Sequence, residues 1–288
     1  MATIAVLGTL DTKGEEHAFV AAQIRARGHQ TLLIDVGALD APKANPDITR
    51  EAVAAEAGID LIGLVSRRDR GETVAAMAKA ATVVLARYVA AGIAQVVRER
   101  RALGQRAVLG LPTGSTPVGV YRELIRMHRD EGLDLSHVVT FNLDEYYGVS
   151  AGQLQSYHRW MREHFFDHVN IPDAHIHIPD GTIPPDRVDA HCQEYEAAIE
   201  RAGGIDIQLL GIGRNGHIGF NEPFSVRNSR TRLATLDTVT RRDAASDFFS
   251  EEAVPTQAIT MGLGTIFAAR KIVLIALGEH KGQIIRET

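Results

Sequence analysis

The 288 residues of the chain are 45% hydrophobic and 23% charged, which is typical of a folded globular protein and excludes a disordered one. The net charge of −5 and the lack of a long basic block argue against a surface that binds nucleic acid. The single cysteine, Cys192, cannot form a disulfide within the chain, which fits a reducing, cytoplasmic location.

The amino-terminal residues, MATIAVLGTLDTKGEE, lack a basic region and reach Asp11 before an apolar stretch is complete, so we expect no signal peptide. The most membrane-like segment, residues 80–97, is rich in alanine and carries Arg87. We expect it to be too weakly apolar to span a membrane, and therefore predict no membrane partner.

The first 37 residues predict a small βαβ unit. Apolar runs at residues 3–7 and 31–36 flank a helical pattern at residues 15–27, which is typical of two parallel strands joined by a crossover helix. Between the first strand and the helix lies GTLDTKG, whose backbone amides offer a place for a phosphate. An ordinary strand-to-helix turn remains the alternative, because Lys13 precedes the last glycine and the order differs from a P-loop.

A second helical region follows. Residues 49–57 predict a short helix capped near Thr49, and residues 71–103 have helical character for about thirty residues, which is long for one globular helix. We expect a break near Leu85 or Gly92. The predicted domains are therefore residues 1–85 and residues 86–288.

From residue 106 strands and helices alternate. Apolar strands are predicted at residues 107–111, 137–141, 205–210 and 272–277, with a short β segment at residues 231–236. Helices are predicted at residues 118–129, 156–168, 187–201, 239–249 and 256–268. This order predicts an α/β fold, a Rossmann-like and mostly parallel sheet with helices on both faces, preceded by the smaller βαβ unit.

The carboxyl ends of parallel strands meet at one edge of a sheet, so the loops after the four main strands are expected to converge. The loop after residue 111 carries hydroxyls and exposed amides just before a helix, which favours an anion. A plain capped helix is the alternative. The candidate phosphate-binding residues are Thr113, Gly114, Ser115 and Thr116.

Asp144 follows the second of these strands and is partly desolvated by its aromatic neighbours, so it can have a raised pKa and carry a proton. An acidic helix cap or a solvated loop is the alternative. The loop after the third strand, GIGRNGHIGFNEP, matches G-x-G-x-x-G, but Pro223 leaves no room for the helix that a dinucleotide site needs. His217 in this loop has Asn215 and Glu222 nearby to fix its tautomer and tune its basicity.

The fourth loop, residues 278–281, offers Lys281 as a mobile positive charge for an anion. The histidine pairs 164/168 and 175/177 are not completed by a carboxylate or cysteine pattern. We therefore expect no metal and no cofactor.

Several long motifs resemble those of the glucosamine-6-phosphate deaminase family. They are LGLPTGSTPVGVY (109–121), VVTFNLDEYYG (138–148), SYHRWMREHFFDHVNIP (156–172), LLGIGRNGHIGFNEP (209–223), SRTRLATLDTVTR (229–241) and LGEHK (277–281). The resemblance covers about residues 86–288. It implies a Rossmann-like fold and a cytoplasmic, homo-oligomeric hydrolase of amino-sugar metabolism that converts glucosamine 6-phosphate and water to fructose 6-phosphate and ammonium.

The resemblance also implies a role for each candidate residue. Asp144 matches the base that moves a proton between C2 and C1, and His217 matches the histidine that opens the sugar ring, oriented by Glu222. Asn215 stands where some members have an aspartate. Residues 113–116 and Lys281 match the groups that bind the substrate phosphate.

The chain departs from the family's pattern in three respects, the first being that the family's usual short amino-terminal strand is not evident. Asp247 stands where the well-known deaminases place an arginine on the phosphate, so either Arg241 or Arg242 compensates or the substrate differs. Members also usually continue beyond the lysine, so we expect a domain truncated at its carboxyl end. The alternatives are a related sugar-phosphate isomerase, a 6-phosphogluconolactonase-like hydrolase, or a non-catalytic module that binds a sugar phosphate or nucleotide.

Residues 1–85 resemble about half of another family, the ATP-binding domain related to a tomato mosaic virus resistance protein. GTLDTKGEE (8–16), IDVG (34–37) and DRGETVAAMA (69–78) carry this resemblance. It implies nucleotide binding by Gly8, Thr9, Thr12 and Lys13.

Overall fold

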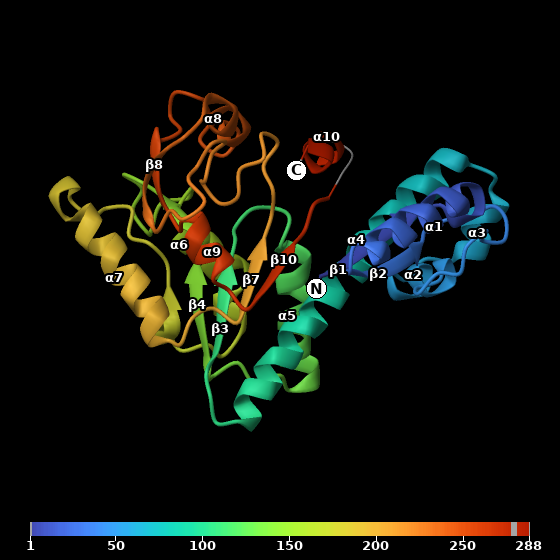
Figure 1. The fold of residues 1–288 in the computed structure, drawn as a ribbon, viewed down its shortest axis with the longest axis horizontal. Coiled ribbons are helices and arrows are strands. Elements are labelled where there is room, and N and C mark those ends of the chain that lie inside the picture. Colours follow the sequence, from blue (N-terminus) through green and yellow to red (C-terminus); the bar gives the residue numbers. More distant parts are fainter. Residues whose placement is uncertain (1, 278–280, 288) are drawn as a thin grey trace. The chain divides into compact units, whose positions relative to one another are not determined.

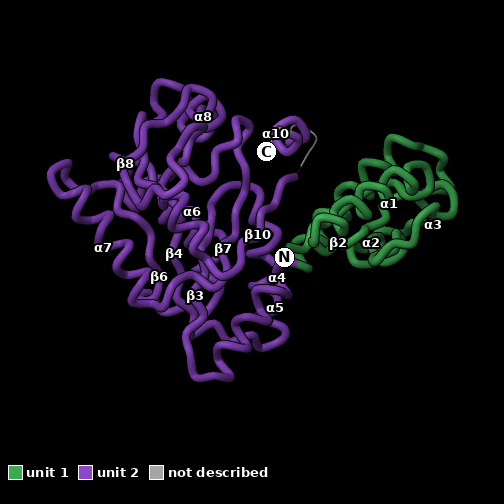
Figure 2. Tube along the Cα trace, in the orientation of Figure 1, with its two compact units in different colours: residues 1–88 green, residues 89–288 purple. Residues whose placement is uncertain are grey.

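The computed structural model describes residues 2–277 and 281–287, which form two compact units, residues 1–88 and residues 89–288 (Figure 2). Of the fourth predicted loop, residues 278–280 lie outside the described residues, whereas Lys281 lies within them. Each unit has its own core and is described by itself.

Unit 1 is built on the predicted parallel strand pair. β1 (Thr3–Gly8) pairs with β2 (Gln30–Asp35) in the register Thr3↔Gln30 to Gly8↔Asp35, and α1 (Leu10–Ala26) makes the crossover. α1 begins five residues earlier than predicted, because its first amide, that of Leu10, donates to the Asp35 carboxylate. α2 (Arg50–Glu56), which is capped by Thr49, and α3 (Leu61–Ser66) complete the unit.

The helix predicted at residues 71–103 is the single helix α4 (Arg70–Ala102), so the break expected near Leu85 or Gly92 was wrong. Alanine-rich sequence has high helix propensity, and buried residues recur along its whole length. Met77, Ala80 and Val84 pack in the core of unit 1, while Ile93 and Val97 are buried in unit 2.

By length and composition α4 would be able to cross a membrane, contrary to our expectation that this stretch is too weakly apolar. Its apolar side chains instead fill protein cores, which is the usual position of such a helix in a globular protein.

The main sheet of unit 2 has five parallel strands in the order β10-β7-β3-β4-β6 (Figure 1). Their bounds are β3 (Ala107–Leu111), β4 (Val138–Asn142), β6 (Ile176–His177), β7 (Ile207–Leu210) and β10 (Lys271–Leu274). The predicted α/β fold with a parallel sheet is confirmed. From β3 the chain adds strands in one direction, and from β7 it adds them in the other. The point of reversal therefore lies between β3 and β7, where open α/β sheets bind ligands.

Helices cover both faces of this sheet. They are α5 (Val118–Glu131), α6 (Tyr157–His164), α7 (Val188–Arg201) and α9 (Leu263–Phe267), with short 3₁₀ turns at residues 166–168, 173–175 and 185–187. Right-handed crossovers put α5 and α6 on one face and α7 and α9 on the other, because the strand order reverses between the two pairs. On the second face, Val108 and Phe141 pack with Ile199 of α7 and Ile266 of α9.

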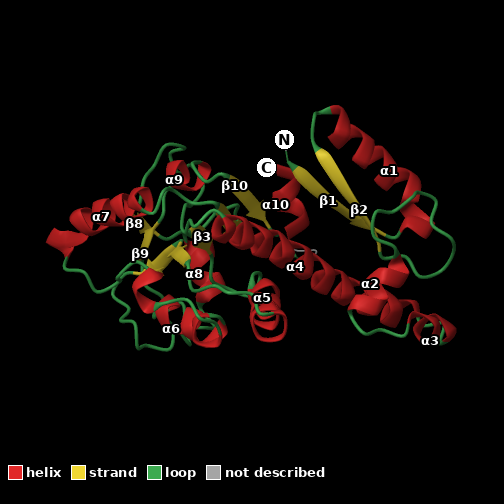
Figure 3. Cartoon of the chain, turned by 90° about the horizontal axis from the view of Figure 1, so that it is seen from below, coloured by secondary structure: helices red, strands yellow, loops and turns green. Residues whose placement is uncertain are grey.

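A smaller antiparallel sheet in the order β5-β9-β8 follows the carboxyl end of β4, and Figure 3 shows its strand β8 beside α7. Its strands are β5 (Asp144–Tyr146), β8 (Arg232–Thr235) and β9 (Gln257–Thr260). The helix predicted at residues 256–268 was therefore wrong for its first half. Residues 258–260 are fully buried and pair with β5 on one side and β8 on the other, and this pairing overrides the helical pattern.

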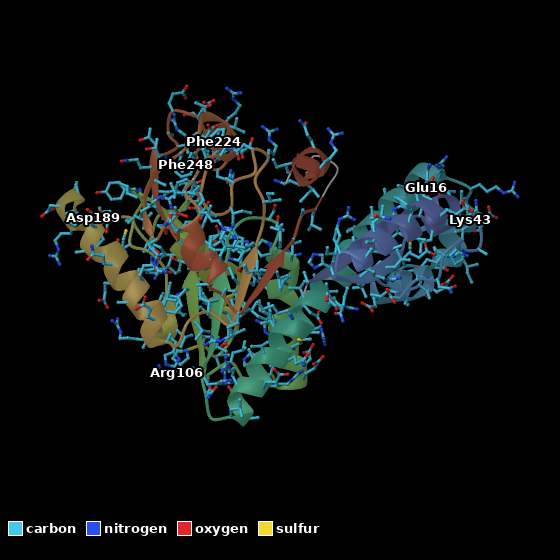
Figure 4. All side chains as sticks on the ribbon, in the orientation of Figure 1. Glu16, Lys43, Arg106, Asp189, Phe224 and Phe248 are labelled. Carbon is cyan, nitrogen blue, oxygen red and sulfur yellow. The ribbon has the colours of Figure 1, made fainter. Side chains whose placement is uncertain are left out.

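α8 (Thr238–Ala244) is shorter than the helix predicted at residues 239–249, and the turn that follows it is held by Phe248 (Figure 4). Phe248 is buried against Tyr146 of β5, with ring centroids 4.9 Å apart, in a cluster that includes Phe220. The last element is α10 (Gly282–Glu287).

Candidate active site

A cleft of about 290 Å³ opens at the carboxyl ends of β3 and β7, at the point where the strand order reverses. Its walls come from the loops after β3, β4 and β7, from α8 and from Lys281. The structure brings the following predicted residues together in it: Thr113, Gly114, Ser115, Thr116, Asp144, His217 and Lys281. Asn215 and Glu222 lie behind His217 rather than in the wall.

The loop after β3 forms one wall of the cleft just before α5. Gly114 has φ of +87°, a conformation that side chains rarely adopt, and this turns the chain into the helix. The buried Tyr121 of α5 donates from its hydroxyl to the carbonyl of Pro112 at 2.6 Å, which fixes the loop from below. The hydroxyls of residues 113, 115 and 116 and the positive end of a 14-residue helix therefore line the same wall, as an anion site requires.

The two consecutive acids Asp144 and Glu145 have opposite surroundings. Successive side chains of a strand point to opposite faces, so only Asp144 enters the cleft. Glu145 accepts hydrogen bonds from the Ser156 hydroxyl at 2.7 Å and from the amides of Tyr157 and His158. Glu145 thus holds the start of α6, and Asp144 is left for chemistry.

Asp144 is 5% exposed, and this burial, followed by the charge of Glu145, raises its pKa to about 8, with the Phe220 amide opposing the shift. Gly219 makes room beside the carboxylate, since a Cβ there would lie 3.1 Å from Asp144 Oδ2. A carboxylate in an environment that favours its protonated form is a stronger base when ionised, which suits removal of a proton from carbon.

His217 is held by a chain of hydrogen bonds. Its Nδ1 lies 2.7 Å from Asn215 Oδ1, and Asn215 Nδ2 donates to Glu222 Oε2 at 2.9 Å. Glu222 Oε1 in turn accepts from the Asp237 amide, and Glu222 Oε2 is 3.7 Å from the ring nitrogen. Asn215 therefore makes the direct contact, and the carboxylate predicted to orient the ring acts through it.

These contacts define the tautomer of His217. Because Asn215 Oδ1 only accepts, Nδ1 carries the proton and Nε2 keeps its lone pair. Burial lowers the pKa of His217, an effect that Glu222 opposes and Lys281 strengthens. The imidazole is consequently neutral near pH 7 and ready to accept a proton at Nε2. The ring lies flat against Gly213, where a Cβ would come within 2.2 Å of it.

Of the cations that the sequence suggested, Lys281 lines the cleft, whereas Arg241 and Arg242 do not. Arg241 donates to the carbonyls of Glu251 and Val254, and Arg242 lies near Glu251, so neither lines the cleft. Asp247 does line it, on the exposed turn after α8. Among the described lining residues, the basic groups besides His217 are Lys281, whose pKa burial lowers, and Arg214.

Besides Asp243, sequence reasoning missed three polar residues of the cleft. Thr240 of α8 places its hydroxyl 3.1 Å from His217 Nδ1. Tyr157 lines the cleft with its hydroxyl in hydrogen-bond contact with Tyr146 and Thr113. Arg214 was passed over within the glycine-rich loop itself. In the sequence, Thr240 and Tyr157 fit ordinary helical patterns, which do not indicate a functional role. Arg214 is a charged residue among glycines at the end of a strand, and this position could have identified it as a candidate.

In unit 1, the residues proposed to bind a nucleotide after β1 are contacted by other side chains of the same unit. The Leu10 amide donates to Asp35 Oδ1 at 3.1 Å, the hydroxyls of Thr9 and Thr12 lie 2.9 Å apart, and Lys13 pairs with Glu16 at 3.1 Å. A Cβ on Gly8 would meet the His17 ring at 2.0 Å. The chain's own side chains therefore already contact the groups proposed for nucleotide binding.

Two family models match the chain. Residues 78–288 match the model described as glucosamine-6-phosphate isomerases/6-phosphogluconolactonase. Residues 2–99 match the amino-terminal domain of the uncharacterised protein family UPF0261. The second match gives the amino-terminal part a family of its own, but the link to the tomato mosaic virus resistance protein is not supported.

Among curated proteins, the chain is 48% identical over 195 residues to a glucosamine-6-phosphate deaminase of Thermoanaerobacter sp. (strain X514), covering 68% of the chain and 76% of the relative. It is 51% identical over 182 residues to the deaminase of Halothermothrix orenii, covering 63% and 75%.

Among solved structures, a monomeric glucosamine-6-phosphate deaminase is 42% identical with a TM-score of 0.68, covering 72% of this chain and 83% of that one. A 6-phosphogluconolactonase from Thermotoga maritima is 20% identical with a TM-score of 0.53, covering 70% and 84%, and shares the fold.

Proposed function

Since the chain belongs to the family of glucosamine-6-phosphate isomerases and 6-phosphogluconolactonases, we propose that it is a deaminase that converts glucosamine 6-phosphate and water to fructose 6-phosphate and ammonium. The observation that carries this choice is the buried Asp144, with its raised pKa, in one cleft with a neutral histidine and a hydroxyl-rich helix start.

The first step opens the sugar ring. The substrate phosphate binds at residues 113–116, which brings the anomeric carbon towards His217. The neutral Nε2 of His217 takes the proton from the O1 hydroxyl and returns it to the ring oxygen, so the aldehyde forms as the C1–O5 bond breaks. Asn215, with Glu222 behind it, keeps Nδ1 protonated and stabilises the imidazolium that forms in between.

The second step is the isomerisation. The Asp144 carboxylate removes the proton from C2 while the substrate's own ammonium group gives a proton to O1, which produces an enolamine. The Asp144 carboxylic acid then delivers its proton to C1, which leaves a protonated imine at C2. Water adds to this imine, and ammonia departs to give the ketone. A base that cycles between carboxylate and carboxylic acid suits this step, because its pKa of about 8 lies near the working pH.

Release of ammonia from glucosamine 6-phosphate by the purified full chain, with fructose 6-phosphate as the second product, tests the proposal. In D₂O the product should carry deuterium at C1, which records the proton transfer. Hydrolysis of 6-phosphogluconolactone without ammonia release would instead favour the lactonase alternative, whose solved structures share the fold at low identity.

The assembly and location of the enzyme stay predictions. The relative of known structure is described as monomeric. Light scattering of the purified protein tests the homo-oligomer expected from the family, and a monomer in solution would contradict it. A cytoplasmic location follows from the metabolic role and awaits fractionation of cells.

Nucleotide binding by unit 1 also stays a prediction. The exposed side chains of Thr12 and Lys13 at the start of α1 support it. ATP binding that is measured by calorimetry and lost in Lys13→Ala would favour it. No binding by the unmodified chain would contradict it.

A further inference from the structure

The charges around the cleft leave a problem for a phosphate ester. Besides Asp144, the carboxylates of Asp243 and Asp247 line it, one on α8 and one on the turn that follows. A phosphate dianion bound at residues 113–116 shares the cleft with both acids, and like charges in a partly desolvated site are costly. The cations that offset them must come from the cleft wall.

Arg214 is placed to do this. It lies on the loop after β7, which runs beside the phosphate-binding loop, since a Cβ on Gly211 would lie 3.8 Å from the Thr116 hydroxyl. Its guanidinium forms two contacts with Asp243, Nε to Oδ2 at 3.0 Å and Nη2 to Oδ1 at 2.8 Å. This bidentate contact between a guanidinium and a carboxylate has the geometry that arginine also uses to bind phosphate.

Arg214 can readily exchange Asp243 for another anionic partner. The Arg214 side chain is 51% exposed and the Asp243 side chain 36% exposed, and ion pairs with that exposure contribute little to stability. A phosphate dianion carries twice the charge of the carboxylate, and two of its oxygens can accept hydrogen bonds from the guanidinium. The guanidinium therefore gains by changing partner when a phosphate enters the cleft.

We propose that Arg214 is a specificity-determining residue for the phosphate ester, and that Asp243 is the partner that holds its guanidinium while the cleft is empty. The proposal rests on the function proposed above, which makes the substrate a sugar phosphate. Arg214 supplies a planar guanidinium for bidentate hydrogen bonds to the phosphate, and the Lys281 ammonium group supplies a second positive charge whose hydrogen bonds have no fixed direction. Together they balance Asp243 and Asp247.

The test compares Arg214→Ala and Arg214→Lys with Arg242→Ala, which removes an arginine from α8 that does not line the cleft. KM and kcat are measured with glucosamine 6-phosphate, and the inhibition constant with inorganic phosphate. Loss of a charge-assisted bidentate contact should raise both KM and the inhibition constant about 10- to 100-fold in Arg214→Ala, with kcat little changed. Arg214→Lys should recover part of the loss, and Arg242→Ala should match the unmodified enzyme.

Asp243→Asn tests the resting partner. Removing the carboxylate frees the guanidinium and takes one negative charge from the cleft, so KM should fall by about fivefold or less with kcat unchanged. A rise in KM would overturn the role assigned to Asp243. Melting curves for all variants show whether the fold is kept.

A KM for Arg214→Ala equal to that of Arg242→Ala would overturn the role of Arg214. If the unmodified enzyme releases no ammonia, the proposed function fails, but calorimetry with inorganic phosphate still decides this inference. Phosphate that binds the unmodified chain and Arg242→Ala, and binds Arg214→Ala more weakly, supports it. Equal binding by all three contradicts it.

Discussion

Two loops of this chain look alike in sequence and are used differently. GTLDTKG (8–14) after β1 and PTGSTP (112–117) after β3 both carry glycines and hydroxyls, although residues 10–14 already belong to α1 in the structure. In unit 1 the Asp35 carboxylate, on the strand next to β1, accepts from the Leu10 amide at 3.1 Å and the Gly37 amide at 2.8 Å. In unit 2 the corresponding wall borders a cleft of about 290 Å³.

The difference comes from where the neighbouring strand places its acid. Asp35 is in register with Gly8, the last residue of β1, so its carboxylate reaches the helix start directly. Leu111, the last residue of β3, is in register with Asn142, and the acid Asp144 comes two residues later, on β5. A shift of two residues distinguishes an internal anion that accepts from the helix start from an acid that lines an open cleft. Anion sites at helix starts are therefore recognised by the neighbouring strand as much as by the loop.

The largest effect is expected from Asp144→Asn. The amide keeps the shape of the side chain but cannot take a proton from C2, so kcat for ammonia release should fall by about 10³-fold or more. In the unmodified enzyme kcat/KM should rise with pH towards about 8 as the carboxylate ionises. An unchanged kcat in the variant would show that another group is the base.

The pH dependence of the melting temperature of Asp144→Asn serves as a control for its folding. Because the folded pKa of Asp144 lies above the ordinary value of 3.8, the folded state binds the proton more tightly than the unfolded state between these two values. Its stabilising contribution is complete below about pH 4 and is lost as pH rises towards 8. Asp144→Asn does not titrate, so its melting temperature relative to the unmodified protein should increase over this range. A variant that is inactive and less stable at pH 8 would indicate misfolding instead.

His217→Gln is expected to have the second-largest effect. Glutamine can retain a polar contact to Asn215, but no group replaces Nε2 as the proton acceptor in ring opening. The loss in kcat should be about 10²-fold, since ring opening also occurs slowly in water. A substrate supplied in the open-chain form should recover much of the rate, and no recovery would place His217 in a later step.

Much of this site could be predicted from the sequence because it depends on strands with continuous apolar runs. β3, β4 and β7 are buried on both faces, so their sequences give both their positions and the loops at their ends. A parallel sheet then brings those loops to one edge. Asp144, His217 and residues 113–116 meet in the cleft for this reason.

The rest depends on contacts between distant segments. Strand β9 was predicted as a helix, because its four residues become a strand by pairing with β8 and with Asp144–Tyr146, which lies more than a hundred residues earlier. The partner of Arg214 was equally hidden, since Asp243 reaches it only when α8 packs over the cleft in the observed helical phase. Sequence periodicity determines neither a cross-sheet pairing nor which side chain of a short helix faces a ligand.

A smaller effect on catalysis is expected from Glu222→Gln. Glu222 raises the pKa of His217 against the larger effect of burial, so loss of its charge should lower that pKa further. Below the step of the kcat/KM profile that reports Asp144, a second and steeper fall reports protonation of His217. This lower step should move to lower pH by about one unit or less, with a several-fold loss of kcat from the weaker base. A shift to higher pH would contradict the hydrogen-bond chain through Asn215.

The smallest effect on catalysis, and the most direct test of the comparison between the two loops, is expected from Asp35→Ala. The change leaves the amides of Leu10 and Gly37 buried without their acceptor, which should destabilise unit 1 by about 2–4 kcal/mol and speed hydrogen exchange in residues 8–14. Asp35→Asn is the matched control, because its amide oxygen can still accept both bonds, and it should exchange more slowly than the alanine variant. Deaminase kcat should not change, since Asp35 lies in unit 1 and the cleft in unit 2. If Asp35→Ala gains affinity for inorganic phosphate at this loop, the Asp35 carboxylate is what prevents an anion from binding at the start of α1. If hydrogen exchange is unaffected, the difference between the two loops does not depend on Asp35.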